Sequence, residues 1–290
     1  MRNSSKKAGE LDCIQFPEYS LFMRTCRDGL SAIYPFKSRS SPDFHGWKFS
    51  PGWPPSYQAF GRMRSLLAIQ DAIRLKPTRV LEVAAGGGGL AASLTKVGCS
   101  VVVNDLLEEQ ITGAIKEYCT GDTIKVVGGN MFDLSPIQLC KFDLVIACEV
   151  IEHVAHPEDL LNHLKKFLKP EGRILLTTPN GAHFRNNLPT YSEISDFDEL
   201  ESYQFKPDAD GHLFLFTPQE LSKLAETVGL QIEQISVWGT PMLSGHFGFR
   251  FMAGRFLTRA AYKTELLVQH MRSSKRERLC VALSAILRLP

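Results

Sequence analysis

Short apolar runs alternate with segments of helix length along the middle of the chain, and this alternation limits the fold more than any other feature. Helical segments over 89–97, 108–118 and 157–168 separate most of the runs, which are RVLEVA, CSVVVND, TIKVVGG, FDLVIAC and GRILLTTP. Strands joined by helices form βαβ units, and a near-continuous Val, Ile and Leu content indicates burial on both faces. The sequence therefore predicts an α/β domain with a doubly wound, mostly parallel sheet.

Further elements extend this domain on both sides. A helix over 59–75 leads into the sheet, and TPQELSKLAETVGL and then LQIEQISVWG predict a capped helix followed by a strand. Residues 1–58 are expected to form a partly irregular N-terminal extension, because their second half is dense in Pro, Gly and aromatic residues. The main domain is expected over 59–240, and a basic helical appendage over 241–290. That helix is predicted from four side chains near one face of 275–289: Leu279, Leu283, Ile286 and Leu287.

Cysteine content and hydropathy limit the cellular compartments in which the protein is expected. The seven cysteines are widely spaced and form no CxxC pair, which argues against a disulfide framework and against a zinc ribbon. The first residues lack the apolar stretch of a secretory signal, and charged residues interrupt every run that approaches the length of a membrane span. A cytoplasmic location is expected.

A glycine-rich turn, LEVAAGGGGLAASL, follows the first predicted strand. Its small residues allow a sharp turn and a close approach by a ligand, and the following helix presents free amide groups. Asp105 ends the second strand, 19 residues after Gly86, where a carboxylate can accept both hydroxyls of a ribose. A nucleotide-like ligand is therefore expected. Gly86, Gly88 and Ala91 also satisfy a dinucleotide pattern, so a nicotinamide-dependent oxidoreductase is an alternative.

The whole series of segments resembles the class I S-adenosylmethionine-dependent methyltransferases. Within them it is similar to the branch that contains the ubiquinone-biosynthesis O-methyltransferases and the type 11 methyltransferases. The segments are LEVAAGGGG, VVVND, GGNMFD, FDLVIACEVIEHV, LKPEGRILLTTPN and HLFLFTPQELSKLAETVGL, and the resemblance covers about residues 79–238. It implies a Rossmann-like sheet with a final antiparallel strand, S-adenosylmethionine as cofactor, and methyl transfer to an oxygen or nitrogen of a small molecule.

The resemblance also implies where the cofactor would lie. Glu82 would orient the loop and engage the methionine ammonium, and the turn around Ala84, Gly86 and Gly88 would pass beneath the methionine and ribose. Asp105 would hold the ribose hydroxyls. Ala84 replaces the usual first glycine, so either the cofactor sits slightly differently or this residue has a negative φ. The replacement also leaves open a non-catalytic partner protein that kept the fold.

The adenine and methionine ends have their own expected contacts. Asn130 and the amide of Met131 would read the adenine edge, with Leu106 and Phe132 as apolar walls. Two residues after the fourth strand would border the methionine moiety: Cys148 and Glu149.

Methyl transfer itself makes few demands on acid or base groups, because the sulfonium is already an activated methyl donor. A base is needed only for a poorly ionised hydroxyl or a charged amine. The candidates flank the carboxyl ends of the strands: His153, which we favour, His183 and His212, with His156 beside them.

The motif EVIEH supplies a second interpretation of the same region. Glu149, Glu152 and His153, with the distant His212 or His183, could bind a divalent cation that orients paired oxygens on the acceptor. Ubiquinone enzymes and small-RNA 2′-O-methyltransferases with EVIEH use it in this way, so a metal-dependent RNA 2′-O-methyltransferase is an alternative function. A local cap or ion pair for Glu152 is the favoured interpretation, and no metal is included among the expected cofactors.

Charge is unevenly distributed, and it bears on the partners. A lid is expected over 181–212, where Phe184, Tyr191, Phe197, Tyr203 and Phe205 offer apolar surface. Seven acids against one lysine over 190–210 would repel an RNA backbone, which favours a small neutral or cationic acceptor and disfavours nucleic acid. Nine Lys or Arg against two Glu over 250–290 make peripheral membrane contact through the C-terminal tail an alternative to burial of its apolar face.

Overall fold

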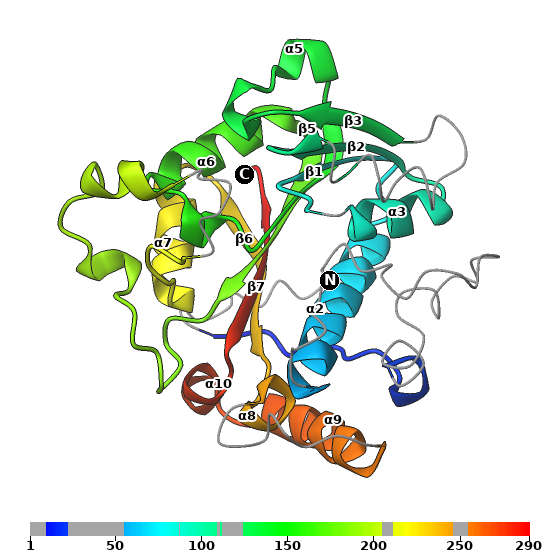
Figure 1. Ribbon diagram of the computed structural model, residues 1–290, viewed down its shortest axis with the longest axis vertical. Helices are drawn as coiled ribbons and strands as arrows, with labels where there is room; N and C mark the ends of the chain where they lie inside the picture. Colours follow the sequence, from blue (N-terminus) through cyan, green and yellow to red (C-terminus); the bar gives the residue numbers. More distant parts are fainter. Residues whose placement is uncertain are drawn as a thin grey trace.

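A seven-stranded sheet runs through the part of the chain that the structure describes, with the strand order β3-β2-β1-β4-β5-β7-β6 (Figure 1). The structure is a computed structural model that describes residues 10–22, 55–86, 88–108, 111, 124–204, 211–245 and 255–290. The strands are β1 (Arg79–Val83), β2 (Ser100–Asp105), β3 (Ile124–Gly128), β4 (Phe142–Cys148), β5 (Leu168–Pro179), β6 (Gln231–Trp238) and β7 (Ala282–Arg288). The first five pair in parallel, whereas β7 lies antiparallel between β5 and β6.

Helices cover both faces of the sheet because successive strand residues point to opposite sides. In β1, Val80 packs into one apolar cluster with α2 and α3, whereas Leu81 packs into another with α6 and α7. These helices lie on opposite sides of the sheet in Figure 1. The helices are α2 (Pro55–Arg74), α3 (Gly89–Lys96), α5 (Pro136–Leu139), α6 (Pro157–Leu164), α7 (Pro218–Thr227), α8 (Pro241–Ser244), α9 (Arg255–Gln269) and α10 (Ser273–Leu279), with 3-10 turns η2 (Met131–Asp133), η3 (Ile151–His153), η4 (Lys165–Phe167), η5 (Tyr191–Glu193) and η6 (Glu199–Tyr203).

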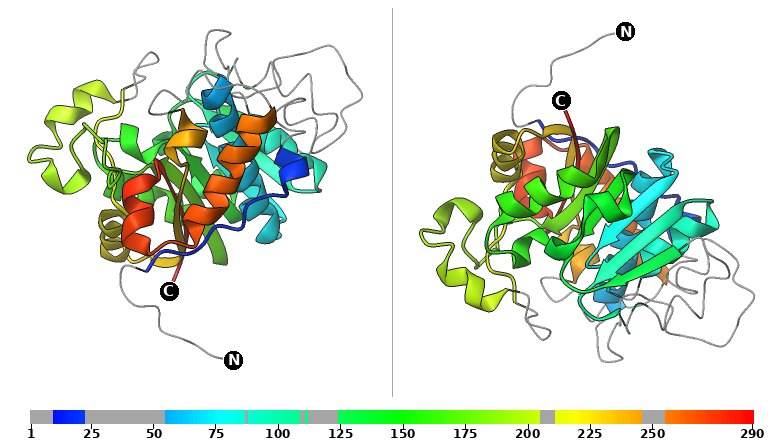
Figure 2. Two further views of the ribbon diagram at one scale, coloured as in Figure 1. Left: turned by 90° about the horizontal axis from the view of Figure 1, so that it is seen from below. Right: turned by 90° about the horizontal axis from the view of Figure 1, so that it is seen from above.

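The N-terminal segment 10–22 packs along the C-terminal elements. In Figure 2 it runs past α9 and α10 in dark blue. The backbone N–H of Asp12 donates to the carbonyl of Ile235 at 2.7 Å, and its carboxylate accepts from the N–H of Ile235 at 2.9 Å. The buried guanidinium of Arg276 donates to the carbonyls of Leu11 and Asp12 at 2.7 and 2.8 Å. Residues 11 and 12 therefore link the edge strand β6 to helix α10.

The structure confirms the predicted fold class, the five central strands and the helices expected over 89–97 and 157–168, with bounds that shift by a few residues. Thr217 and Glu220 form the capping box of α7 as predicted, with the Thr217 Oγ1 accepting from the Glu220 N–H at 3.2 Å. The final antiparallel strand that the resemblance implied is β7.

The predicted helical face over 275–289 is wrong. Only Ser273–Leu279 is helical, and Ala282–Arg288 forms β7 in the interior of the sheet. Leu283, Ile286 and Leu287 are buried in the core, so they do not offer the apolar face that membrane contact through the tail would require. Strand β7 lies within the main sheet, although it comes after residue 240.

Some predictions fall on residues outside the described ranges. These are most of the helix expected over 108–118, the aromatic stretch before residue 55, and Phe205 of the expected lid. Within the described ranges, no helix combines the length and the hydropathy needed to cross a membrane.

Candidate active site

Three cavities lie near the carboxyl edge of the central strands, and all three include Glu149 in their walls. The turn cavity, of about 210 Å³, lies between the turn after β1 and helix α2. The edge cavity, of about 200 Å³, lies beyond the ends of β2 and β3. The outer cavity, of about 630 Å³, lies between α2 and the segment that follows β5. Ligands bind outside the carboxyl ends of the strands in open α/β sheets, so this is the expected place for a site.

The glycine turn is held in a left-handed conformation. Ala84, Gly86 and Gly88 have φ values of 49°, 55° and 69°. The Asp105 Oδ2 accepts from the N–H of Gly86 at 2.7 Å, so the acid of β2 fixes the turn of β1. The alternative of a negative φ at Ala84 is therefore wrong, and this residue carries backbone strain that glycine would avoid.

Glu82 places a buried carboxyl group beneath the turn. It lines the turn cavity, and burial raises the pKa of its carboxyl group to about 8, although a hydrogen bond from the N–H of Ala91 opposes this rise. Its Oε2 atom is buried and has no hydrogen-bond partner among the described residues. A buried acceptor without a partner is costly, and a cationic ligand in the turn cavity would satisfy it.

The edge cavity brings together most of the residues expected around ribose and adenine. Asp105, Leu106, Asn130 and Met131 all line it. The Asn130 Oδ1 also accepts from the N–H of Phe132 at 3.0 Å, so this side chain shapes the turn as well. The Phe132 ring does not line the edge cavity.

Two features of this region differ from the sequence analysis. Phe132 packs against the ring of His163, with 5.4 Å between their centroids. Asn104 is a residue that sequence reasoning missed: it lines the edge cavity, and its Nδ2 donates to the carbonyls of Val127 and Gly129 at 2.9 Å each. Its buried place within the apolar run VVVND was the available signal.

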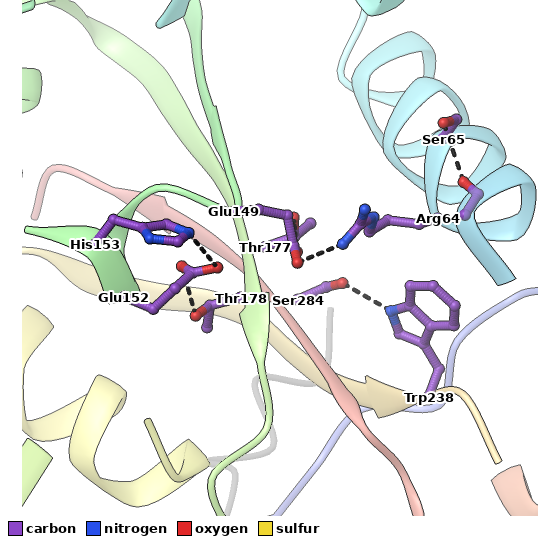
Figure 3. Close-up of polar contacts among 10 residues, drawn as sticks. Arg64, Ser65, Glu149, Glu152, His153, Thr177, Thr178, Trp238 and Ser284 are labelled. Atoms are coloured by element: carbon purple, nitrogen blue, oxygen red, sulfur yellow. Dashed lines mark hydrogen bonds and ion pairs between the residues drawn. The ribbon is translucent and has the colours of Figure 1, made fainter. Parts of the chain in front are cut away.

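Glu149 joins the cavities through a short polar network (Figure 3). One carboxylate oxygen accepts from the Thr177 Oγ1 at 2.9 Å, and the other pairs with the guanidinium of Arg64 from α2. Glu149 has a φ of 55°, a strained value that is common at functional sites. Arg64 lines the turn cavity and the outer cavity and was missed, because one arginine on an amphipathic helix has no distinguishing sequence signal.

A cluster of polar atoms lies beside this network and comes from Glu152, His153 and His212. One ligand atom from each lies within 4.8 Å of the others. The Glu152 Oε2 accepts from the Thr178 Oγ1 at 2.9 Å, whereas its buried Oε1 has no hydrogen-bond partner among the described residues. Burial, and then the charge of Glu149, raise the pKa of Glu152 well above its usual range.

The two histidines of this group contact each other and face different cavities. The rings of His153 and His212 meet edge to face at 4.9 Å, and the His153 Nδ1 lies 3.0 Å from the carbonyl oxygen of Gly211. His153 lines the edge cavity, and His212 lines the outer cavity. Burial, and then the neighbouring His153, lower the pKa of His212, so its ring is neutral at pH 7 and can accept a proton.

The remaining two histidine candidates occupy separate places. His183 is buried in the wall of the outer cavity, with His212 in the same wall. His156 lies away from the three cavities, where its Nε2 is 3.1 Å from Glu201 and 3.4 Å from Asp198. The geometry therefore keeps His153, His183 and His212 near the site and separates His156 from it.

Cys148 lines the turn cavity, as expected for a residue that borders the methionine end. Burial raises the pKa of its thiol to about 12, so the group stays protonated and is a poor nucleophile at neutral pH.

The segment expected to form a lid contributes to the wall of the edge cavity from its C-terminal part. Tyr203, Gln204 and Gly211 line the edge cavity. Within the segment, Tyr191 stacks on Phe216, with 5.0 Å between the ring centroids, and anchors it to the domain.

Comparison with known proteins identifies relatives over the same region. A family model described as a methyltransferase domain matches residues 56–235. A ubiquinone biosynthesis O-methyltransferase of Xanthomonas axonopodis pv. citri is 29% identical over 167 residues, which cover 56% of this chain and 67% of the relative. The enzyme of the same name from Aliivibrio fischeri is 28% identical over 187 residues, which cover 64% and 77%.

Solved structures share the fold at lower identity. The CcbJ methyltransferase from Streptomyces caelestis has a TM-score of 0.50 and 15% identity, with 78% of this chain and 88% of that chain covered. A Galdieria sulphuraria protein described as a sarcosine dimethylglycine methyltransferase has a TM-score of 0.51 and 14% identity, with 78% and 84% covered. The antiparallel β7 between β5 and β6 also departs from the six-stranded parallel order of the dinucleotide-binding fold.

Proposed function

Because this chain belongs to the methyltransferase-domain family and is an S-adenosylmethionine-dependent methyltransferase, we propose that its three cavities divide one reaction between them. The turn cavity and the edge cavity hold the cofactor, and the outer cavity holds a small-molecule acceptor. The observation that carries this division is the position of Glu149 in the walls of all three. When bound, the cofactor supplies a methyl group already activated on its sulfonium. The relatives' name, O-methyltransferase, favours an oxygen as the accepting atom over a nitrogen.

The residues of the turn and edge cavities fit this cofactor. The unpartnered Oε2 of Glu82 suits an ammonium group, and Asp105 suits a pair of ribose hydroxyls because its Oδ1 accepts only a long 3.3 Å hydrogen bond from Leu107. The apolar side chain of Leu106, which is 40% exposed, offers a wall for a flat aromatic ring.

Arg64 fits the carboxylate end of the same ligand. It lies between the turn cavity and the outer cavity and is already paired with a carboxylate, that of Glu149. A guanidinium can hold two carboxylates at once through different N–H groups, so Arg64 would keep Glu149 in place while it holds the ligand.

His212 is the residue best placed to take a proton from the acceptor. It lines the outer cavity and is neutral at pH 7, because burial and His153 lower the pKa of its ring. His153, the first choice from sequence, would orient His212 through the contact between the two rings and would face the edge cavity. His183 would shape the wall of the acceptor cavity.

A divalent cation is a second candidate component of the site. Glu152, His153 and His212 would hold it with one atom each. The Glu152 Oε1 fits such a ligand, because it has no hydrogen-bond partner among the described residues and lies 4.0 Å from the His153 Nε2. The cation would orient paired oxygens on the acceptor. Glu149 would not take part in the present arrangement, since Thr177 and Arg64 occupy its two oxygens. Unchanged activity after dialysis against a chelator would remove this component and leave the base role of His212.

Location and organisation remain part of the proposal. We expect a cytoplasmic enzyme of small-molecule biosynthesis, and the five cysteines that the structure describes are all free, as a reducing compartment favours. We also expect the segment 181–212 to act as a lid over the cofactor, supported by the three residues that it contributes to the edge cavity.

The test is direct binding followed by turnover. Isothermal titration with S-adenosylmethionine and with S-adenosylhomocysteine should give one site per chain, and a screen of phenols and amines with methyl-labelled donor should yield a labelled product. Binding of a nicotinamide cofactor in place of both compounds would contradict the proposal.

A further inference from the structure

The exposed side chains of α9 lie along one side of this helix. From residue 259 onward they are Arg259, Lys263, Leu266 and Leu267, and the spacing continues to His270 just after the helix. Intervals of three and four residues bring side chains to the same face of a helix. The buried side chains of α9 point the other way and are Ala261, Tyr262, Glu265, Val268 and Gln269. Helix α9 therefore presents one face to the core and one to solvent.

Buried hydrogen bonds fix which side of α9 faces outward. The carboxyl oxygens of Glu265 accept from the N–H of Gly239 at 3.1 Å and from the N–H of Thr240. The Tyr262 hydroxyl donates to the carbonyl of Pro17 at 2.5 Å. The segment after β6 and the N-terminal segment thus hold the inner side of α9, so its outer side keeps one orientation.

The charged side chains of this outer side are cationic, and they continue through the following turn into α10, which lies beside α9 at one end of the molecule (Figures 1 and 2). Among the described residues of 257–281, the exposed charged side chains are Arg259, Lys263, Arg272, Lys275 and Arg278. None of the five forms an ion pair with a described residue, and the guanidinium of Arg259 lies over the ring of Tyr19 at 5.8 Å. Their charged ends are therefore directed to solvent.

The acids of this region do not lie among these cations. Glu265 is fully buried, and Glu277 is half-buried with its Oε1 accepting from the Gln219 Nε2 at 3.0 Å. The neighbouring N-terminal segment carries two exposed acids, Glu10 and Glu18, outside α9 and α10. No acid is exposed within the described part of the two helices or of the turn that joins them.

Three large apolar side chains are exposed in the middle of the same stretch. Leu267 is 70% exposed, Leu266 is 38% exposed and Met271 is 37% exposed. They lie between Lys263 and Arg272 in the sequence, and none of them lines the three cavities near the candidate site. Apolar side chains that cluster on a surface mark a place of contact with a partner.

We propose that the α9–α10 face, formed by the exposed side chains from Arg259 to Arg278, docks on the surface of an anionic lipid bilayer. The three apolar side chains enter the boundary between headgroups and acyl chains, and the long cationic side chains reach the lipid phosphates around them. A nucleic acid would neutralise the cations through phosphate contacts and leave the apolar side chains in water. The combination of cations and apolar side chains therefore favours a bilayer.

The face lies outside the residues that the methyltransferase family model matches, 56–235, and it adjoins the outer cavity. Helix α8 packs on α9 and contributes Ser244 to the wall of this cavity. The N–H of Phe184 donates to the carbonyl of Arg278 at 3.1 Å, which links α10 to the segment after β5. Docking through this face does not depend on the proposed function, and it brings the outer cavity close to the lipid surface.

Vesicle co-sedimentation with the full chain tests the proposal. Vesicles of equal parts phosphatidylcholine and phosphatidylglycerol are compared with vesicles of phosphatidylcholine alone. We expect wild-type protein to sediment with the anionic vesicles, to do so less as salt is added because salt screens surface charges, and to stay in solution with the neutral vesicles. Binding to neither kind of vesicle, or equal binding to both, refutes the proposal.

A matched pair of double variants tests the role of charge. Lys263→Gln with Lys275→Gln should weaken binding to anionic vesicles about fivefold for each charge removed. Lys125→Gln with Lys166→Gln removes two exposed lysines, on β3 and in η4, and should bind like wild type. Equal losses in the two double variants would show that net charge alone matters and would overturn the assignment of the face.

A second matched pair tests the apolar side chains. Leu267→Ser should weaken binding about tenfold, because the leucine leaves water when the face docks. Ile137→Ser changes a side chain on α5 that is 93% exposed, and it should have no effect. Unchanged binding of Leu267→Ser would contradict insertion into the bilayer. Retention of wild-type protein by an RNA duplex at the same ionic strength, without sedimentation on anionic vesicles, would assign the cations to nucleic acid and refute the bilayer as partner.

Discussion

Replacing Glu82 with glutamine should change the pH dependence of stability in a defined way. The carboxyl group of Glu82 is buried, and burial raises its pKa to about 8 from an ordinary value of 4.5. Between these two values, the folded protein keeps the proton on Glu82 and the unfolded chain releases it. The free energy of unfolding therefore decreases as pH rises through this range. Glutamine has nearly the same shape and does not titrate.

The magnitude follows from the size of the shift. Each pH unit in this interval lowers the free energy of unfolding by about 1.4 kcal/mol, and the effect weakens near the folded-state pKa of about 8. From pH 6 to pH 8, the free energy of unfolding of the wild-type protein should fall by about 2 kcal/mol relative to that of Glu82→Gln. Other buried acids, such as Glu152 and Glu265, are present in both proteins and cancel in the difference.

The assay is urea denaturation of both proteins at pH 6, 7 and 8, with the difference in unfolding free energy plotted against pH. A constant offset in unfolding free energy between the two proteins reports the cost of burying an amide and carries no information about the pKa of Glu82. A difference that stays constant over the three pH values would refute a raised pKa at Glu82.

Three further predictions concern the turn and the histidines. Ala84→Gly should raise the free energy of unfolding by about 1 kcal/mol, because Ala84 has a φ of 49°; thermal or urea denaturation measures it, and a loss of stability would contradict the strained turn. His153→Ala should lower kcat while the Kd for S-adenosylhomocysteine, measured by titration, changes little, since the ring lies beside His212. Burial lowers the pKa of His212 from its ordinary value of 6.5, so kcat should fall toward acidic pH with an apparent pKa below 6.5 as this base becomes protonated. An apparent pKa above 6.5 in the pH profile of kcat would exclude His212 as the base.

The sequence predicts the parallel half of the sheet well because its strands are buried on both faces. Runs such as FDLVIAC are apolar apart from Asp143, and turn residues and helices of defined length bound them. The same property explains the error at β7. Six of its seven residues are buried, so it lacks the alternation that marks a half-buried strand, and its Leu and Ile positions also match a helical spacing.

The sequence predicts the site residues that lie at the ends of strands. It does not predict contacts that depend on how the helices pack on the sheet. Glu82, Asp105 and Asn130 end or follow strands, so their meeting at one edge follows from topology. The partners of Glu149 depend on how α2 packs on the sheet, which no local pattern reports. The position of two acids was also not predictable from sequence, because Asp198 and Glu201 face His156 and do not line the outer cavity.

The central claim is that a nucleoside with a sulfonium lies across the ends of β1 and β2, held at its ribose by Asp105. The most direct measurement is the Kd of S-adenosylhomocysteine for wild-type protein, for Asp105→Ala and Asp105→Asn, and for Glu171→Ala, a control acid whose side chain is 93% exposed. The account predicts binding by wild type and the control alike, and a loss of about tenfold to a hundredfold in both Asp105 variants. Equal affinity in all four proteins would contradict it.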